Sequence, residues 1–566
     1  MERWANGRMT GGAAEAASPK VARREPLGHD GKRSWSFVQT RQISVFGFGE
    51  RRIESSPSLM QSIVPLRSAI LVTTIFAALH ASAAVKLPAI ISDHMVLQQD
   101  ATLPIWGWAE AGEEVIVSVA GTTERTKADA AGKWSVKLGK LKAGGPHTLT
   151  VKGTNELTVN DVLVGEVWLG SGQSNMAMRV NGAKDYELEK PAANWPQVRM
   201  FTESSGAATT AQAGGAGAWV VCAPETVGAF SATLYFTGRE LHKVLGVPVG
   251  LINSSVGGTP IESWIAPEAQ KASAELQGFF AETEKAEAAV DIEKAKAKYV
   301  KDLAAWTEAA KLARTEKKPA PRKPQDPVAL RAKKGNVGGL FNGKIAPLIP
   351  YAIRGALWYQ GEANSTDPKA AYYGHQLALL VKDWRARWGY EFPMAWVQLP
   401  NFGGPGRNWP AVREGMLQTL KLPKTGMAVA IDIGEEKNIH PKNKQEVGRR
   451  LSLWALGEVY GKKVEATCGP LPAGHKVRGA EVALSFKHTD GGLVAKDGEL
   501  KGFVVAGEDR QWKPAQARID GAQVIVSSPE VKQPVAVRYA WENWPTCNLY
   551  NGAGLPASPF RTDDWK

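Results

Sequence analysis

The stretch Val-Trp-Leu-Gly-Ser-Gly-Gln-Ser-Asn-Met at residues 167–176 decides how this chain can be interpreted. An apolar run ends in glycines and a serine follows, which is typical of a strand that turns sharply into a helix. Small residues permit the bend that leaves the Ser174 hydroxyl clear of the sheet edge, where a base can activate it. A capping serine in an ordinary loop gives the same pattern, so other segments must decide between the two.

The composition predicts a large folded protein without nucleic acid as a partner. With 566 residues, 43% of them hydrophobic, the chain should form two to four domains. The net charge of +13 is scattered, and no nucleic-acid-binding motif accompanies it. Three widely spaced cysteines and the lack of a His-Glu-x-x-His motif predict no metal site and no cofactor. One disulfide between Cys468 and Cys547 is left open.

Residues 60–83 have the pattern of a secretory signal peptide. One basic residue, Arg67, precedes an apolar core of about a dozen residues, and the small residues Ala81, Ser82 and Ala83 follow. That core is too short to span a bilayer permanently. Residues 1–59 lack any apolar period and are predicted to be a disordered or mis-assigned extension, with Met60 as the true start. A cytoplasmic tail on a membrane anchor is the alternative.

We therefore expect a secreted or periplasmic protein with no stable membrane span after signal cleavage, and its oligomeric state stays open. Short alternating runs predict an N-terminal β-sandwich domain over residues 84–159. Continuous apolar runs alternate with amphipathic segments over residues 160–463, as in an α/β core whose parallel strands are covered on both faces. A helical, Lys/Glu-rich insertion at about 268–334 is expected to cover one side of the site. Residues 464–566 again show strand patterns and predict a C-terminal β-rich domain.

If Ser174 is a nucleophile, a histidine at the same sheet edge is needed as its general base. His440 follows an apolar strand and precedes a helix, at the edge where catalytic groups of open α/β sheets collect. His375 is the second choice, because it lies inside a helical pattern. Two more strands end in Gly-rich polar turns, at residues 253–264 and 357–364. Four strand ends of this kind make a coherent site.

These motifs resemble those of one enzyme family. Gly172-Gln-Ser-Asn-Met176, Gly257-Gly-Thr259, Tyr359-Gln-Gly-Glu362 and Ile439-His-Pro-Lys-Asn-Lys444 look like the motif set of the sialate O-acetylesterase family, a branch of the SGNH hydrolases. The resemblance runs from about residue 86 to the C-terminus, and the Lys/Glu-rich insertion is its main departure. It implies an α/β, SGNH-type (flavodoxin-like) three-layer hydrolase core with flanking β-sandwich-like domains.

The resemblance also implies roles for individual residues. Ser174 would be the nucleophile and His440 the general base. The oxyanion would be held by the Ser174 amide, the Gly258 amide (Gly257 if the turn is shifted) and the Gln360 side chain, because negative charge develops on the carbonyl oxygen during attack. The residues expected to bind substrate or to support the catalytic groups are Gln173, Asn175, Gly257, Glu362 and Asn364.

The acid that would orient the histidine is open. Many SGNH enzymes carry an aspartate three residues before the histidine, but Lys437 occupies that position here. Asp432 is chosen because it ends a strand. Glu435, Glu436, Asn438 or no acid at all are the alternatives.

The predicted function is that of an exported serine esterase that removes O-acetyl groups from small-molecule or polysaccharide carbohydrates through an acetyl-enzyme. Trp264, Trp358 and Trp409 lie near the proposed site in sequence and could stack on sugar faces. The rivals are a non-catalytic polysaccharide-binding protein built on a degenerate hydrolase, and a lipase or peptidase that uses the same catalytic groups. The acetylated glycan itself is not predicted, because the walls of a pocket set that choice.

Overall fold

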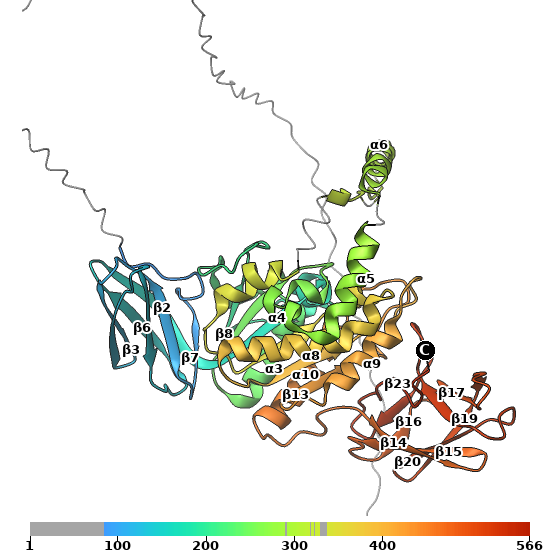
Figure 1. The fold of residues 1–566 in the computed structure, drawn as a ribbon. Helices are drawn as coiled ribbons and strands as arrows, with labels where there is room; N and C mark the ends of the chain where they lie inside the picture. The colour runs from blue at the N-terminus through green and yellow to red at the C-terminus, as the bar shows by residue number, and fades with distance from the viewer. Residues whose placement is uncertain (1–83, 289–290, 317, 322, 329–336, 566) are drawn as a thin grey trace, which may run out of the picture. The chain divides into compact units, whose positions relative to one another are not determined.

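The computed structural model describes residues 84–288, 291–316, 318–321, 323–328 and 337–565, so the predicted signal peptide and N-terminal extension lie outside the described residues. The central sheet has the strand order β13-β12-β11-β7-β10-β8-β9, in which β9 is antiparallel to β8 and the other neighbours are parallel. Figure 1 labels β7, β8 and β13 of this sheet. The strands of this sheet are β7 (Glu156–Gly172), β8 (Trp195–Thr202), β9 (Trp219–Cys222), β10 (Val249–Ser255), β11 (Gly355–Tyr359), β12 (Met394–Gln398) and β13 (Thr425–Val429).

Strand β7 joins two parts of the chain. Its first half pairs with β6 and β1, and its second half pairs with β10 and β11. Burial follows this division, because exposed and buried residues mix up to about Asp161 and every residue from Val162 to Gly172 is buried. Continuous burial is what a parallel strand covered on both faces requires. The predicted domain boundary after Val159 therefore falls inside one unbroken strand.

Helices cover both faces of the central sheet, which confirms the three-layer α/β prediction. Leu234 of α3 (Ala232–Leu245) lies against Gly170 of β7, and Trp384 of α8 (Lys369–Trp388) packs edge-on against Trp358 of β11. Gly170 is in register with Leu357, the residue before Trp358, so the two contacts are on opposite faces. Helix α10 (Lys444–Trp454) packs beside α3, and α9 (Trp409–Thr419) beside α8.

The flanking segments are β-rich, as the sequence predicts. Alternating burial in β2 and β5 matches the period of two expected for strands with one covered face. The N-terminal strands are β1 (Val96–Gln98), β2 (Leu103–Trp108), β3 (Glu114–Val119), β4 (Thr122–Lys127), β5 (Lys133–Leu138) and β6 (Gly144–Lys152). The C-terminal strands are β14 (Leu471–Arg478), β15 (Glu481–Lys487), β16 (Leu493–Ala495), β17 (Phe503–Ala506), β18 (Lys513–Pro514), β19 (Gln516–Asp520), β20 (Gln523–Ser527), β21 (Ala536–Tyr539), β22 (Leu549–Asn551) and β23 (Phe560–Arg561), and they enclose an apolar cluster of their own.

Much of the Lys/Glu-rich insertion is helical, whereas residues 318–321 and 323–326 are not. It contains α4 (Pro267–Ala272), α5 (Gln277–Ala288) and α6 (Ile292–Thr315). Phe279 of α5 contacts Tyr372 of α8, with ring centroids 5.6 Å apart, which anchors α5 to the core. That the insertion covers one side of the site stays a prediction. The short helices α1 (Ser174–Ala177) and α2 (Tyr186–Glu189) follow β7.

Two possibilities that the sequence left open for side chains are not realised. Cys468 and Cys547 are both free thiols, so the disulfide left open by the sequence is not formed. Trp264, Trp358 and Trp409 are completely buried in the core, where no sugar can stack on them. Their size makes them good core residues, and burial removes the ring faces from solvent. Within the described ranges, no helix combines the length and apolar character that a bilayer crossing requires.

Candidate active site

The turn after β7 presents Ser174 at the carboxyl edge of the central sheet. Gly172 has φ of +136°, and a Cβ on it would lie 2.2 Å from the Tyr359 carbonyl oxygen of the neighbouring strand. Only glycine fits such a position. The chain then enters α1 at Ser174, whose side chain is half-buried in the midst of buried neighbours. The local sequence thus produces the exposed hydroxyl that the pattern predicts.

The structure brings Ser174 and His440 together. Ser174 Oγ lies 2.7 Å from His440 Nε2, although the two residues are 266 positions apart. His440 stands on the loop between β13 and α10, and its side chain is also half-buried. His375, the alternative base, is an exposed residue of α8. A hydroxyl within hydrogen-bonding distance of an imidazole is the arrangement that lets the imidazole take the hydroxyl proton.

The glycine turn after β10 lies beside the nucleophile. A Cβ on Gly257 would be 3.4 Å from the Ser174 Cβ, and Gly258 has φ of +75°. Both glycines are exposed. Among the described residues, neither their backbone N–H groups nor that of Ser174 has a hydrogen-bond partner. Open N–H groups near an attacking hydroxyl are suited to a developing oxyanion, and the roles of these amides stay predictions.

Gln360 does not have the surroundings expected of an oxyanion donor. Its side chain is completely buried, and Nε2 donates to Gln173 Oε1 (3.1 Å), the Thr259 carbonyl (3.2 Å) and Asn364 Oδ1 (2.8 Å). Its Oε1 accepts from Tyr373 at 3.0 Å. An amide nitrogen has two protons, so three protein acceptors leave none for a ligand. Gln360 therefore braces the loops at the sheet edge, and these contacts compete with its expected role as an oxyanion donor.

Two of the residues expected to bind substrate or to support the catalytic groups, Gln173 and Asn364, are buried and hydrogen-bonded within the protein. Gln173 Oε1 accepts from the Ala363 backbone N–H at 3.1 Å, which ties the nucleophile turn to η7 (Glu362–Asn364). Asn364 Oδ1 accepts from the Ile261 N–H, and Asn364 Nδ2 donates to Glu262 Oε2 at 2.8 Å. These contacts suit the supporting role that was one of the two expected for both side chains.

Asn175 connects the nucleophile to the base. Its Nδ2 donates to Glu362 Oε1 at 2.5 Å and to the Ile439 carbonyl at 3.0 Å, and its Oδ1 accepts from Lys444 Nζ at 2.6 Å. Asn175 follows Ser174 and Ile439 precedes His440, so this amide spans both catalytic segments.

Glu362 and Lys444 are buried charged groups beneath the site. Burial raises the pKa of Glu362 above its usual value, although the hydrogen bond from Asn175 and the charge of Lys444 oppose this. Burial lowers the pKa of Lys444 to about 7, against the opposing attraction of Glu362 and Glu435. The sequence analysis assigned no role to Lys444. The one feature of the sequence that pointed to Lys444 was its position at the end of the motif Ile439-His-Pro-Lys-Asn-Lys444, which also contains His440.

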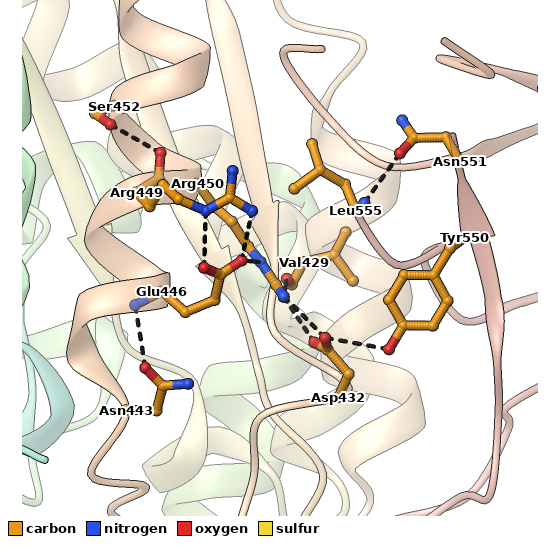
Figure 2. A network of polar contacts seen from close by, with 10 residues as sticks. All are labelled: Val429, Asp432, Asn443, Glu446, Arg449, Arg450, Ser452, Tyr550, Asn551 and Leu555. Carbon is orange, nitrogen blue, oxygen red and sulfur yellow. Dashed lines mark hydrogen bonds and ion pairs between the residues drawn. The ribbon is translucent and has the colours of Figure 1, made fainter. Parts of the chain in front are cut away.

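Asp432 is held by Arg450 and by the C-terminal segment (Figure 2). Its two oxygens accept from Arg450 Nη1 at 2.6 Å and Nη2 at 2.8 Å, and Tyr550 donates a further hydrogen bond at 3.2 Å. Arg450 also donates to Glu446, so the carboxylate belongs to an ion-pair network at the start of α10. These contacts compete with the predicted role of Asp432 as the acid partner of His440.

The alternative acids shape the loop that carries the base. Asn438 Oδ1 accepts from the His440 backbone N–H, and Asn438 Nδ2 donates to the His440 carbonyl and to Glu435 Oε2. Glu435 also accepts from the Lys442 N–H at 2.8 Å. Glu436 is exposed. Glu435 and Asn438 therefore brace the loop, and the identity of the acid stays open. Within the described residues, no group of three or more His, Cys, Asp or Glu side chains is placed to hold a metal ion.

Comparison with known proteins agrees with this geometry. The family model "Carbohydrate esterase, sialic acid-specific acetylesterase" matches residues 164–293 and 343–456, which contain Ser174 and His440. Sialate O-acetylesterase from Rattus norvegicus is 30% identical over 83% of this chain and 93% of its own length. The chain belongs to the sialate O-acetylesterase family. The human family member is also 30% identical, over 83% of this chain and 91% of its own.

A solved structure supports the fold of this sialate O-acetylesterase family member. A carbohydrate acetylesterase from Xanthomonas citri has a TM-score of 0.71 and 36% sequence identity, covering 85% of this chain and 100% of that one. The chain is thus a carboxylic ester hydrolase with an SGNH-type α/β core. The family model leaves out residues 294–342, which include the second part of the Lys/Glu-rich insertion, and matches its first part up to residue 293.

Proposed function

We propose that the protein is an exported serine esterase that removes O-acetyl groups from carbohydrates through an acetyl-enzyme intermediate. The observation that supports this most directly is the 2.7 Å distance between Ser174 Oγ and His440 Nε2, beside an exposed glycine turn. The names of its relatives, sialate O-acetylesterase and carbohydrate acetylesterase, support acetylated sugars as the substrate class. Either an acetylated sialic acid or an acetylated polysaccharide fits this proposal.

The proposed reaction proceeds in two halves. In the first, His440 takes the hydroxyl proton as Ser174 Oγ attacks the acetyl carbonyl carbon, and the backbone N–H groups of Ser174 and Gly258 receive the oxyanion. The tetrahedral adduct collapses, the protonated imidazole gives its proton to the departing sugar oxygen, and acetyl-Ser174 remains. In the second half, His440 deprotonates a water that attacks the acetyl carbonyl. The bond from the acetyl carbon to Ser174 Oγ then breaks, the protonated imidazole returns its proton to Ser174 Oγ, and acetate leaves.

A panel of acetylated sugars tests the proposal. Wild-type protein and Ser174→Ala would be assayed for acetate release from acetylated sialosides, acetylated xylan and 4-nitrophenyl acetate, with a long-chain 4-nitrophenyl ester as the lipase control. We expect wild-type protein to favour acetyl esters and Ser174→Ala to release no acetate above background. Mass spectrometry of quenched reactions should find one acetyl group on the peptide that contains Ser174. Acetate release by Ser174→Ala would overturn the proposal.

Export is a separate part of the proposal. It rests on the pattern of residues 60–83, with small residues at 81–83 before the predicted cleavage point. N-terminal sequencing of protein from the periplasm or medium of the native host should begin at Ala84. Recovery of an intact chain from the cytoplasm alone would contradict export and leave the esterase proposal untouched.

A further inference from the structure

Lys444 is a completely buried lysine at the first residue of α10, and the reaction proposed above does not use it. Removing an ammonium group from water costs free energy unless partners replace the lost hydration. Its Nζ donates to Asn175 Oδ1 at 2.6 Å and lies 5.1 Å from the centre of the Tyr359 ring. Among charged side chains, Glu362 and Glu435 are the ones whose attraction favours the protonated form of Lys444.

The contacts of Asn175 depend on which way its amide points. As observed, Oδ1 faces the lysine, while Nδ2 faces the Glu362 carboxylate and the Ile439 carbonyl. An asparagine amide is nearly symmetric in shape, and only its partners distinguish oxygen from nitrogen. A rotation by half a turn would point Oδ1 at two other oxygens and break both hydrogen bonds. In the rotated form Lys444 Nζ would lose its acceptor and face Nδ2 instead, so its hydrogen bond to Oδ1 adds to the preference for the observed form.

The orientation of Asn175 in turn sets the distance between the catalytic groups. The amide fixes the residue after Ser174 to the residue before His440. We propose that Lys444 is a positioning residue of this esterase, which orients the Asn175 amide and so holds the Ser174 turn and the His440 loop in register. The inference rests on the proposed serine-esterase function. A displacement of about 1 Å between reacting groups can lower a rate by roughly 100-fold.

Lys344 offers a matched control. It is also a buried lysine, and it donates to the backbone carbonyls of Glu203 and Ser205 rather than to a residue of the site. Both Lys444→Met and Lys344→Met remove a buried charge and keep the length of the side chain. We expect kcat of folded Lys444→Met on 4-nitrophenyl acetate to fall about 100-fold, with KM changed less than threefold, because positioning acts on the chemical step. Folded Lys344→Met should keep kcat within about threefold.

A double variant separates positioning from simple charge compensation. If Lys444 serves only to neutralise Glu362, then Lys444→Met with Glu362→Gln should recover the wild-type kcat. Under our proposal the double variant stays slow, since a glutamine at 362 can pair with either orientation of the Asn175 amide. It also lacks both buried charges, which keeps the test usable if Lys444→Met alone fails to fold.

The outcomes are distinct. A folded Lys444→Met, or double variant, with kcat within threefold of wild type would overturn the role of Lys444. So would an equal loss of kcat in Lys344→Met, because a general effect of burial would then explain both. Activity of Ser174→Ala would instead overturn the proposed function, whatever Lys444→Met does.

Discussion

The turns after β7 and β11 are neighbours at the sheet edge, and both contain a glycine at positive φ. The first turn carries the nucleophile, whereas the second holds neighbouring loops in place through hydrogen bonds. Gly172 and Tyr359 are in register, and each turn contains a glycine at positive φ, Gly172 at +136° and Gly361 at +151°. In the first turn, Ser174 is half-exposed and contacts His440. In the second, Gln360 is completely buried and its amide is used by protein acceptors.

The difference comes from what covers each turn. Around Gly361, the Val412 and Met416 side chains of α9 lie within 3.1 Å of where a Cβ would stand. Next to Ser174, the nearby turn consists of exposed Gly257 and Gly258. A polar side chain under a helix must satisfy its hydrogen bonds within the protein, whereas one beside bare glycines stays available for chemistry. Position at the sheet edge is therefore necessary for a catalytic role, but it is not sufficient.

The largest expected effect is a loss of kcat on substitution of Ser174 in the turn after β7. Ser174→Ala should lower kcat at least about 1000-fold on 4-nitrophenyl acetate, because it removes the hydroxyl that lies 2.7 Å from His440 Nε2. Ser171, a completely buried serine of β7, is the control. Ser171→Ala should leave kcat unchanged within about twofold. Equal loss in both variants would mean that the turn, and not the hydroxyl, matters.

Asp432 extends the comparison to the turn after β13. Asp432→Asn should lower the free energy of unfolding by about 3 to 5 kcal/mol, since it leaves Arg450 buried with a broken ion pair. Its kcat should stay within tenfold of wild type when measured on folded protein. Tyr550→Phe, which removes a single hydrogen bond to the same carboxylate, should cost only about 1 kcal/mol. A loss of roughly 10,000-fold in kcat for Asp432→Asn would instead mark it as the acid that orients His440.

A substitution in the buried turn after β11 should lower the free energy of unfolding more than it lowers kcat. Gln360→Ala removes a buried amide and its hydrogen bonds to three oxygens, so we expect a loss of about 3 kcal/mol in the free energy of unfolding by denaturant. Its kcat should fall less than tenfold. Removal of an oxyanion donor would lower kcat by roughly 100- to 1000-fold with stability preserved, and that result would reverse our assignment.

A smaller effect than the loss expected for Gln360→Ala is a pH dependence of stability. The folded-state pKa of Lys444, about 7, lies below the ordinary value of 10.5. Between these values the unfolded chain binds more protons at this site, so folding is favoured increasingly as pH rises. Wild-type protein should therefore gain about 2 kcal/mol of stability relative to Lys444→Met between pH 7 and pH 9 in denaturant titrations. A constant difference across this range would show that Lys444 keeps its proton.

Much of the fold follows from local patterns. Continuous apolar runs such as those around Leu251, Leu357 and Val397 predict parallel strands, and the structure places them in β10, β11 and β12. The unbroken course of β7 was not predictable in this way: the sequence pattern predicted a domain boundary after Val159, but β7 continues through that point and changes its partners. A single strand can show alternating burial in one half and continuous burial in the other. The change of pattern within β7 therefore marks the point where its partner strand changes, and the strand itself does not end there.

What the sequence by itself determined is the order of strands and helices, the sharp glycine turn before Ser174, and the family, through four short motifs at strand ends. Tertiary structure decided which of those polar side chains faces solvent. It buried Gln360 and Trp358, paired Asp432 with Arg450 and Tyr550, and placed Lys444 beneath Asn175. The reason is physical: spacing along the chain encodes local backbone geometry, whereas burial and hydrogen bonding depend on neighbours that distant segments bring into contact.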